Sequence, residues 1–536
     1  MPTFLILISL IILCCVLLNN ASFRIGVPVL LAFILLGIAV GNIDAIAIAL
    51  EDFSAGERIC STALIFIMFY GGFGTRWETA KPVAVQAGIL ATLGVAITAG
   101  ITGLFCHFVL KWGWIESFLM GSVISSTDAA SVFSILRSRN LGLKNNAAPL
   151  LEMESGSNDP MSYMLTILML SLMNGTATGA GIGLMLVKQI VLGAGLGILI
   201  AKGTVFCMRK IDFATSGFDS LFIFAVAIFS YALPSLIGGN GYLSAYLVGI
   251  ILGNEDFGGK KKLVGFFDAM TGLMQVVIFF VLGLLARPAD LISVALPALA
   301  IFACLLLLSR PISIVSILPF FKKFTLKQQG FISFVGLRGA ASIVFAITAM
   351  LDNDMLEHDI FSIVFVIVLI SIAIQGSLIP TVAKKLDMID PDADVMKTFS
   401  DFGDESDLQF FSIKVTDGNV WLDRKIMELG LSHDSLICMI IRDNGRRVLP
   451  TGQTVIRNGD EVIFCSKEFD KKDKVRIVEH RVRQGSQWDG RPIKDYPNVA
   501  NDQVLLIRRG KGTIIPHGGT ILKSGDLLYI NKGQMQ

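Results

Sequence analysis

Four short stretches place charged, hydroxyl or amide side chains inside long apolar runs of the chain. They are residues 125–131, residues 152–160, Gln275 and residues 336–342. The first is rich in hydroxyl groups, the second carries three carboxylates, and the last contains an arginine. Polar groups of this kind are costly inside a membrane and mark ion pathways and proton relays. The pattern therefore predicts a buried site that handles ions or protons.

The spacing of residues 152–160 can be read on a helix. At about 100° per residue, Glu152, Ser155 and Asp159 share one face, and Glu154 lies on another. Arg338 is the strongly basic residue expected deep in a late span, so we expect it to pair with one of these carboxylates. If that carboxylate is Glu154, Asp159 stays unpaired and can exchange a proton for a cation.

Oxygen ligands for such a cation lie close to Asp159 in this pattern. The hydroxyl groups of Thr127 and Ser155 are hard ligands suited to an alkali ion. In an alternative interpretation the acids lie in loops and cap helices, and Pro160, directly after Asp159, favours it. Residues 161–173 are too short to cross a bilayer alone, which argues against that alternative.

The composition excludes an ordinary soluble globular protein. The chain is 53% hydrophobic and 16% charged, with a mean hydropathy of +0.68, whereas about 25% charged residues is usual. Long apolar runs predict an all-α membrane bundle of thirteen spans. The expected spans are residues 3–18, 27–41, 58–75, 82–108, 114–136, 148–173, 184–207, 219–237, 240–253, 263–286, 289–309, 328–351 and 359–380.

The positive residues predict the orientation of this bundle. With the N-terminus outside, the loops expected inside hold most of the lysines and arginines, as cytoplasmic loops do. That set is Arg24, Arg76, Lys81, Arg137, Arg139, Lys144, Arg209, Lys210, Lys260, Lys261, Lys262, Arg310, Lys322, Lys323, Lys327, Lys384 and Lys385. We therefore expect a multi-pass protein of the bacterial inner (plasma) membrane, with its C-terminal part in the cytoplasm.

The C-terminal part has a different composition and an internal repeat. We expect a membrane domain over residues 1–385, an acidic linker over 386–406, and two repeats over 407–470 and 471–536. The repeat is offset first by 67 and then by 66 residues. Its matched positions are Gly418 and Gly485, Trp421 and Trp488, Arg424 and Arg491, Ile426 and Ile493, Arg442 and Arg508, Pro450 and Pro516, Gly452 and Gly518, Thr454 and Thr520, Gly459 and Gly525, and Asp460 and Asp526. Alternating apolar runs between Gly and Asp turns predict a mostly β, α+β region.

The membrane part resembles the monovalent cation:proton antiporter-1 family over nearly all of residues 1–385. The resemblance rests on Thr127-Asp128, on Glu154-Ser155 followed by Asn158-Asp159, and on the run Gly-Leu-Arg-Gly-Ala at residues 336–340. It implies thirteen spans built as inverted repeats, and a core with two crossed broken helices. It also implies a homodimer that moves by an elevator-like rocking, and a transporter rather than an enzyme.

The resemblance also implies roles for individual residues. Asp159 would be the ion and proton site, with Thr127 and Ser155 as ion ligands. Asp128, the acid within the hydroxyl-rich run, is a further ion-site candidate and the first suspect if a second acid titrates. Asn158 stands where electrogenic relatives carry a second aspartate, so the sequence resembles the electroneutral branch.

One ion pair and two departures complete this comparison. The resemblance implies that Glu154 pairs with Arg338. Tyr70 stands where the family motif carries an acid between Phe and Gly-Gly, so one carboxylate ligand is missing and the preference between K⁺ and Na⁺ is open. Ala129 stands where a proline usually follows Thr-Asp, so we expect a milder break in that helix.

The C-terminal repeats resemble TrkA-C (RCK-C) domains, which bind small regulators in potassium transporters and channels. This rests on the β pattern and on the turn motif Pro-x-Gly-x-Thr followed by Gly-Asp, at residues 450–460 and 516–526. No Gly-x-Gly-x-x-Gly follows a strand, so the nucleotide-binding RCK-N half is not expected. A regulatory nucleotide, for example a cyclic dinucleotide, is implied by resemblance alone, and no other cofactor is expected. The alternative is that the repeats only support dimerisation.

The whole architecture is similar to the bacterial cell-volume-regulation antiporters, so we expect electroneutral K⁺/H⁺ exchange regulated by the repeats. Na⁺/H⁺ exchange on the same fold is the nearest alternative. A regulated potassium channel is disfavoured because the sequence lacks a Thr-Val-Gly-Tyr-Gly filter. An intramembrane enzyme is disfavoured because there is no His-Glu-x-x-His or Gly-x-Ser-x-Gly motif. The sequence has no stripe of basic residues of the kind that binds nucleic acid. The expected partners are therefore K⁺ or Na⁺, protons, the bilayer and a second copy of the chain.

Overall fold

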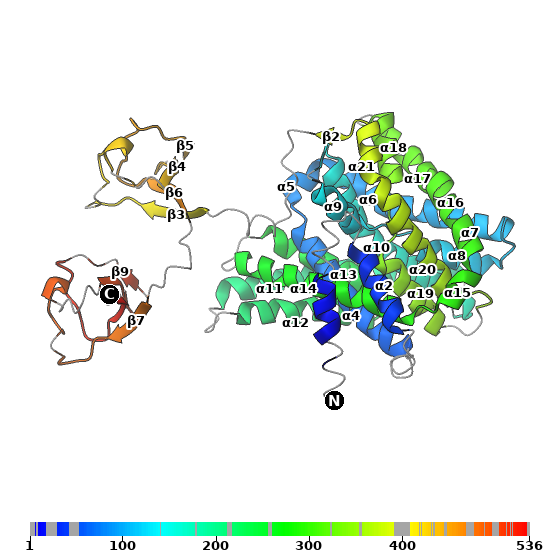
Figure 1. The fold of residues 1–536 in the computed structure, drawn as a ribbon, viewed down its shortest axis with the longest axis horizontal. Helices are drawn as coiled ribbons and strands as arrows, with labels where there is room; N and C mark the ends of the chain where they lie inside the picture. The colour runs from blue at the N-terminus through cyan, green and yellow to red at the C-terminus, as the bar shows by residue number, and fades with distance from the viewer. Residues whose placement is uncertain are drawn as a thin grey trace. The chain divides into compact units, whose positions relative to one another are not determined.

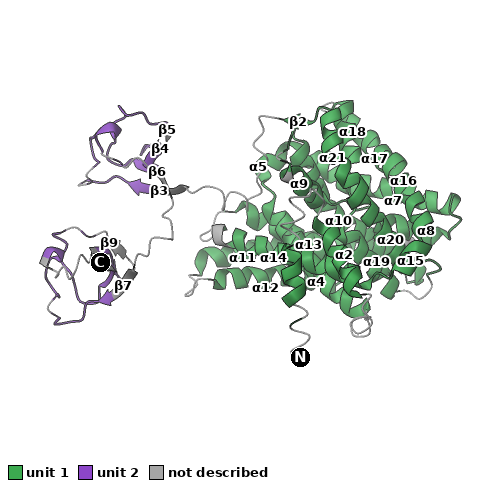
Figure 2. Ribbon diagram, in the orientation of Figure 1, with its two compact units in different colours: residues 1–405 green, residues 406–536 purple. Residues whose placement is uncertain are grey.

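The computed structural model divides the chain into two compact units, Met1–Glu405 and Ser406–Gln536 (Figures 1 and 2). Each unit is described by itself. In the first, the structure describes residues 6, 9–17, 29–41, 53–139, 141–176, 179–211, 217–255, 260–321, 324–352 and 356–390. In the second it describes residues 408–417, 419, 421–429, 431, 435–443, 447–467, 476–486, 488–495, 503–510, 512–514, 516 and 518–532.

The first unit is a bundle of helices (Figure 1). Its α-helices are α2 (Val29–Gly41), α4 (Phe53–Gly74), α5 (Trp77–Ala80), α6 (Ala84–Ile89), α7 (Val95–Phe108), α8 (Trp114–Val123), α9 (Ala129–Ser138), α10 (Ala147–Met173), α11 (Gly179–Lys210), α12 (Phe218–Leu236), α13 (Gly241–Asn254), α14 (Lys260–Leu285), α15 (Pro288–Ser293), α16 (Ala295–Cys304), α17 (Arg310–Ile317), α18 (Leu326–Phe334), α19 (Ala340–Asp352), α20 (Ile360–Ile370) and α21 (Ser377–Lys385). Shorter 3₁₀ or π turns join several of them, namely η1 (Lys81–Val83), η2 (Leu90–Gly94), η3 (Leu305–Ser309), η4 (Leu318–Phe321) and η5 (Ser371–Gly376).

The outer surface of this bundle is apolar, as expected of a protein surrounded by lipid. Helix α11, for example, exposes Leu184 by 70%, Leu199 by 66% and Phe206 by 62%. Within the described residues, seven helices are long and apolar enough to cross a membrane, and three shorter apolar helices accompany them. The predicted all-α membrane class is confirmed. The count of thirteen spans stays a prediction, because broken helices such as α8 and α9 are each too short to cross alone.

Helices α4 and α13 approach so closely that only glycine fits between them. A Cβ atom on Gly249 would lie 2.1 Å from the carbonyl oxygen of Phe69, and one on Gly253 would lie 2.1 Å from that of Phe73. Small residues let membrane helices pack backbone against backbone. The contact fixes α4, the helix that carries Tyr70.

The described part of the second unit consists of two four-stranded antiparallel sheets with the strand orders β3-β6-β4-β5 and β7-β10-β8-β9. The strands are β3 (Leu408–Lys414), β4 (Ser435–Ile441), β5 (Arg447–Val448), β6 (Glu461–Lys467), β7 (Arg476–Arg481), β8 (Gln503–Arg509), β9 (Gly512–Ile514) and β10 (Leu527–Lys532). The 3₁₀ turns η6 (Ile426–Glu428) and η7 (Ile493–Asp495) occupy equivalent places. Each sheet has its own small apolar core.

The internal repeat is confirmed by matching ion pairs, but one predicted equivalence is wrong. Arg442 donates to Asp460 in the first sheet, and Arg509 donates to Asp526 in the second. The counterpart of Arg442 is therefore Arg509 and not Arg508. The single gap between the repeats falls after this arginine, in the turn that follows β4 and β8, where a change of length leaves the strand pairing intact.

The start of the predicted acidic linker belongs to the first unit. Strand β2 (Ile389–Asp390) pairs antiparallel with β1 (Gly142–Leu143). The Lys144 amide donates to the Met388 carbonyl at 2.9 Å, and its Nζ lies 2.9 Å from Asp387 Oδ1. The hydrogen bond and positive charge of Lys144 lower the pKa of Asp387. Residues 391–406 of the predicted linker lie outside the described residues.

We expect Asp526→Asn to loosen the second sheet, and Asp460→Asn the first, each without changing the other. Asp526 accepts two hydrogen bonds of 2.7 Å from Arg509 and one of 2.8 Å from the Lys523 amide. Loss of a charged acceptor of this kind costs about 2 kcal/mol. Hydrogen exchange by mass spectrometry on the full chain would follow peptides from each sheet. Loss of protection in both sheets after one substitution would contradict their independence.

The same pair should make the second sheet sensitive to acid. Burial acts to raise the pKa of Asp526, but the hydrogen bond and charge of Arg509 outweigh it, so the pKa is lowered. The stabilisation is therefore complete above the unfolded pKa of about 3.9 and is lost as the pH falls through the lower folded value.

Candidate functional site

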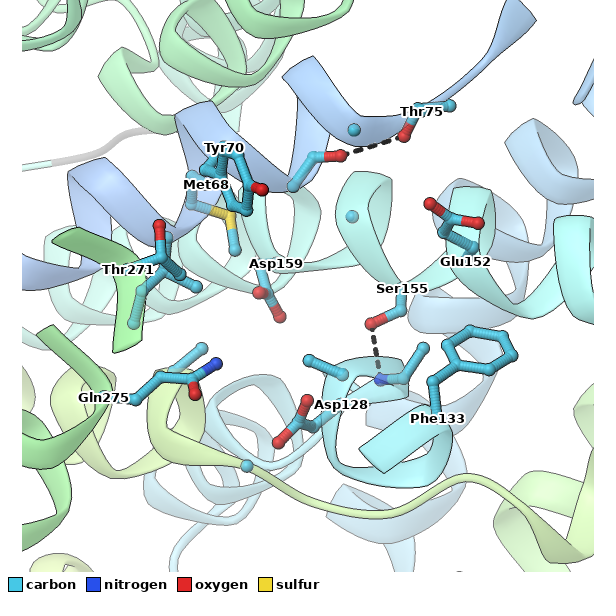
Figure 3. Close-up of a pocket in the computed structure, with 18 of the residues that line it drawn as sticks. Met68, Tyr70, Thr75, Asp128, Phe133, Glu152, Ser155, Asp159, Thr271 and Gln275 are labelled. Carbon is cyan, nitrogen blue, oxygen red and sulfur yellow. Dashed lines mark hydrogen bonds between the residues drawn. The ribbon is translucent and has the colours of Figure 1, made fainter. Parts of the chain in front are cut away.

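A cavity of about 790 Å³ lies in the first unit and is lined by residues of α4, α9, α10 and α14. Four of the five predicted ion-site residues line it, namely Thr127, Asp128, Ser155 and Asp159. Figure 3 labels the last three of them. The fifth, Asn158, is fully buried behind them and contacts Thr127. The structure thus brings together residues from two segments about thirty positions apart.

Helix α10 carries the carboxylate side of the cavity. Glu152, Ser155 and Asp159 all line it, which confirms that they share one helix face. Asp159 is 6% exposed, and Glu154, on another face, is 1% exposed. The helix continues through Pro160, so these acids do not lie in a loop. The carbonyl of Pro160 accepts a hydrogen bond of 2.7 Å from Asn240 Nδ2, which also holds this part of α10 against α13.

The hydroxyl-rich segment forms a true break between α8 and α9. Residues 124–128 are not helical, and Asp128 caps α9 by accepting from the Ser131 amide at 3.1 Å and from the Ser131 hydroxyl. The expectation of a milder break at Ala129 stays a prediction. The Ala129 amide donates to Ser155 Oγ at 2.9 Å, a hydrogen bond that a proline could not make, so the break is held by α10 instead.

Two side chains of α10 fix the position of Thr127. Ser155 Oγ donates to the Thr127 carbonyl at 2.8 Å. Asn158 Nδ2 donates to Thr127 Oγ1 at 2.6 Å, and Asn158 Oδ1 faces the Thr127 amide at 3.4 Å. Ser155 and Asn158 therefore position the loop beside Asp159.

A second break, over residues 335–339 between α18 and α19, crosses the first. The Asp128 amide donates to the Leu337 carbonyl at 2.8 Å, and the hydroxyl groups of Ser126 and Ser342 lie 3.0 Å apart. Gly339 is required at this crossing, because a Cβ atom there would lie 2.5 Å from the Cβ of Asp128.

Arg338 donates hydrogen bonds to backbone carbonyl groups just after the end of α8 and does not pair with Glu154. Its Nη1 donates to the carbonyl oxygens of Ile124 and Ser126, each at 2.7 Å. Its own amide donates to Ser371 Oγ at 3.1 Å, in the π turn η5. A positive group near a helix C-terminus is favourable because the last carbonyls carry partial negative charge.

The predicted Glu154–Arg338 pair is wrong, because Glu154 binds Arg310. Arg310 Nη1 and Nη2 donate to the two carboxylate oxygens at 2.5 and 2.9 Å, and both side chains are at least 95% buried. The sequence-based boundary at residue 309 caused the error. The span runs from Ala295 to Phe321, so Arg310 lies within the membrane part and not in an inside loop.

Sequence reasoning missed part of the cavity wall. Asp268 and Thr271 on α14 line the cavity with Gln275, and Tyr70 on α4 lines it as well. The signal was present, since positions 268, 271 and 275 are spaced by three and four and share one helix face. Only Gln275 was singled out, because the span was judged nearly uncharged and Asp268 near its start was not considered.

The site offers one buried carboxylate among hydroxyl, amide and backbone oxygens. Among the described residues, no Lys, Arg or His lies within ion-pair distance of Asp159. Hard oxygen ligands suit alkali cations, and a carboxylate can hold either a proton or such a cation. A membrane bundle with discontinuous helices that meet at a buried ionisable site is the architecture of secondary transporters. The fold and the site thus define a secondary transporter rather than an enzyme.

The chain belongs to the sodium/hydrogen exchanger family, whose transmembrane domain matches residues 8–385. The TrkA-C domain matches residues 410–468 and 477–532. The chain is 34% identical over 457 residues to the K(+)/H(+) antiporter NhaP of Alkalimonas amylolytica and 32% identical over 458 residues to the K(+)/H(+) antiporter NhaP2 of Shewanella sp. (strain MR-4). Each alignment covers 84% of this chain and 79% of the relative. The Na(+)/H(+) antiporter ApNhaP of Aphanothece halophytica is 25% identical over 407 residues, covering 72% and 75%.

The fold is also that of a solved antiporter. The sodium proton antiporter MjNhaP1 of Methanocaldococcus jannaschii, solved at pH 8, matches with a TM-score of 0.62 and 23% identity. The match covers 70% of this chain and 97% of that one. It confirms the predicted helical membrane antiporter fold, and the two TrkA-C matches confirm the predicted C-terminal domains.

We expect Arg310→Gln to destabilise the protein by about 3–5 kcal/mol, because it leaves Glu154 buried and unpaired. The double variant Glu154→Gln with Arg310→Gln should recover much of this loss. Glu154→Gln should not rescue Arg338→Gln, since Arg338 serves backbone carbonyls. Thermal unfolding of the purified variants in detergent distinguishes these cases. Rescue of Arg338→Gln by Glu154→Gln would instead restore the pairing expected from the sequence.

Proposed function

We propose that the protein exchanges K⁺ for H⁺ across the membrane, with Asp159 as the shared binding site. The observation that carries the proposal is the contrast between two buried carboxylates on α10. Glu154 is neutralised by a bidentate arginine, whereas Asp159 lines the cavity without a cationic partner among the described residues. The names of the NhaP and NhaP2 relatives favour K⁺ as the cation.

A single carboxylate of this kind couples the two fluxes. It holds a proton or a cation but not both, so exchange follows when the empty site does not cross the membrane. In this proposal Thr127 and Ser155 present oxygen ligands, and Asp128 remains engaged as the cap of α9. Because Asn158 is neutral, each cycle moves one positive charge in each direction and is electroneutral.

Na⁺/H⁺ exchange is the second candidate. It is favoured by the name of the ApNhaP relative. Tyr70 lines the cavity where the family motif carries an acid, so the motif leaves the choice between the two cations open. With one carboxylate ligand fewer, the bound cation has to take more of its ligands from hydroxyl, amide and backbone oxygens.

We expect Asp159→Asn to abolish exchange in reconstituted vesicles while leaving the protein folded. Ser157→Ala on the same helix, a residue that does not line the cavity, is the matched control. A pH-sensitive dye inside the vesicles, titrated with K⁺, Na⁺ and Li⁺ in turn, gives the cation preference. Residual exchange in Asp159→Asn would mean that another acid is the shared site for the proton and the cation.

Clamping the membrane potential tests the stoichiometry of the native protein. A net charge would feel about 2.3 kcal/mol per 100 mV, so an electroneutral cycle should run at the same rate at every clamped potential. A clear voltage dependence would mean that a second acid titrates, with Asp128 the first to examine.

We also propose that the TrkA-C domains regulate exchange from the cytoplasm. The support is the β1–β2 pairing, which holds the chain segment leading to these domains against the loop between α9 and α10. That loop joins α9, the helix capped by Asp128, to α10, the helix that carries Asp159. A nucleotide such as a cyclic dinucleotide is the class of ligand proposed for the domains.

The remaining assignments belong to the same proposal. They are a homodimer in the bacterial inner membrane, an N-terminus outside and a cytoplasmic C-terminal region. The domain bounds are 1–385, extended to Asp390 by the β1–β2 pairing, then 407–470 and 471–536. The charge asymmetry of the loops supports this orientation without Arg310, since the other sixteen inside positions remain.

Lys144→Ala should shift the pH profile of exchange toward that of a chain truncated after Asp390, which keeps β2 but lacks the TrkA-C domains. The reason is that the substitution removes the ion pair between Lys144 Nζ and Asp387, which helps the backbone hydrogen bond from the residue 144 amide to Met388 hold β2 in place. Arg209→Ala, which breaks another exposed ion pair with Glu255, is the control and should leave the profile unchanged. If truncation alters the profile and Lys144→Ala does not, the β1–β2 contact is not the route of regulation.

A further inference from the structure

Helix α14 presents a stripe of polar side chains to the cavity. Asp268, Thr271 and Gln275 all line it, and their spacing of three and four residues places them on one helix face. The span that contains them, Leu263–Leu285, is otherwise strongly apolar. Figure 3 shows Thr271 and Gln275 on one side of Asp159, with Asp128 and Ser155 on the other. Polar residues of two separate helices thus face each other across the proposed ion site.

A hydrogen bond holds the charged end of this stripe. Tyr70 OH on α4 donates to Asp268 Oδ1 at 3.3 Å, and both residues line the cavity. Asp268 is exposed, whereas Asp159 is 6% exposed. The stripe therefore leads from a solvated carboxylate to a buried one.

Thr271 is the second independent feature of the stripe. Its side chain is 9% exposed, and Oγ1 has no hydrogen-bond partner among the described residues. A threonine within a helix commonly bonds the carbonyl one turn earlier, and Thr271 does not. An unsatisfied buried hydroxyl costs free energy, so an oxygen in this state beside Asp159 is suited to a bound cation or its water.

The charges around the cavity favour a cation at this position. Four carboxylates line the described wall, from Asp128, Glu152, Asp159 and Asp268, against two guanidinium groups, from Arg76 and Arg137. A cleft that is lined mainly by charges of one sign and has low-dielectric walls raises the local concentration of ions of the opposite charge. Of the four acids, Asp268 and Glu152 are those without a capping role or the proposed exchange role, and only Asp268 lies on the α14 stripe.

We propose that Asp268 is the capture site for the transported cation, held in place by Tyr70, and that Thr271 and Gln275 pass the cation to Asp159. The inference rests on the proposed exchange function and adds a second binding position to it. Capture at a partly solvated carboxylate raises the local cation concentration without taking part in the competition with the proton. Its loss should therefore act on the apparent KM for the cation and spare the maximal rate.

The test measures initial exchange rates against cation concentration in vesicles that contain the full chain. Asp268→Asn should raise the apparent KM by about 3- to 10-fold, a modest share of what electrostatic focusing provides, and approach the native maximal rate at saturating cation. Tyr70→Phe, which removes only the hydrogen bond, and Thr271→Val, which removes only the hydroxyl, should give smaller increases. Asp290→Asn, an exposed acid on α15 that does not line the cavity, is the control and should match the native protein.

Two further measurements make the result decisive. The double variant Tyr70→Asp with Asp268→Asn moves the carboxylate from position 268 to position 70, its hydrogen-bond partner. The apparent KM of this variant should be close to the native value. Raising the ionic strength with a salt of a large, untransported cation should reduce the difference between native protein and Asp268→Asn, since screening weakens exposed charges.

The outcomes separate this inference from the function on which it rests. If the native protein exchanges neither K⁺ nor Na⁺ for protons, the proposed function itself fails. If it exchanges and Asp268→Asn has the native KM, only the capture site is wrong. A fall in maximal rate with an unchanged KM in folded Asp268→Asn would also overturn it, because the residue would then act in the transport step.

Discussion

Two membrane helices stop inside the bundle, and the peptide groups left free at those ends constrain the structure around them. Helix α8 ends at Val123 and α18 ends at Phe334. Each unsatisfied peptide group costs several kcal/mol where water is absent. Arg338 meets part of this demand by donating to the carbonyls of Ile124 and Ser126, and the Asp128 amide meets another part by donating to Leu337. Each break thus supplies hydrogen-bond partners for free peptide groups of the other, and Gly339 leaves room for the two to meet.

This use of Arg338 determines how the other buried charges must be arranged. Because its guanidinium serves backbone carbonyls, a different cation has to neutralise Glu154, and Arg310 does so. Had Arg338 paired with Glu154, the end of α8 would have lost its donors. Arg338 therefore binds the carbonyl groups at a helix end, and Arg310 neutralises a buried carboxylate. Asp159 is left as the buried acid of α10 that is free to bind a transported ion in the proposed mechanism.

The sequence was sufficient for the residues that periodicity places on one helix. The shared face of Glu152, Ser155 and Asp159 follows from their spacing alone. Thr127, which the resemblance placed in the same site, lines the same cavity. It was not sufficient for Arg310, because an arginine at an expected span end looks like a loop residue. Which of two arginines reaches Glu154 depends on how three helices pack. Packing of that kind is a tertiary property with no local pattern.

Backbone hydrogen bonds at Ala129 and Met388 were equally beyond sequence reasoning. Substituting alanine for proline suggested a weaker break, whereas the free amide is what ties the break to Ser155. Acidic composition after residue 385 suggested a linker, but two-residue strands such as β2 are too short to leave a periodic signal. The internal repeat was found because it recurs over sixty residues, and it failed only at Arg508, where a one-residue shift depends on the position of a turn.

Helix α10 unites these observations, because it begins at the contact with the C-terminal segment and carries the proposed ion site. Strand β1 ends at Leu143, and α10 starts at Ala147 after two asparagines with positive φ, Asn145 and Asn146. Twelve residues separate Ala147 from Asp159, or about 18 Å along the helix axis. A helix transmits displacement along its axis better than a loop does, and Ser155 and Asn158 tie the same helix to the break at Thr127. A movement imposed on β2 would therefore reach both Asp159 and the break at Thr127 through one rigid element.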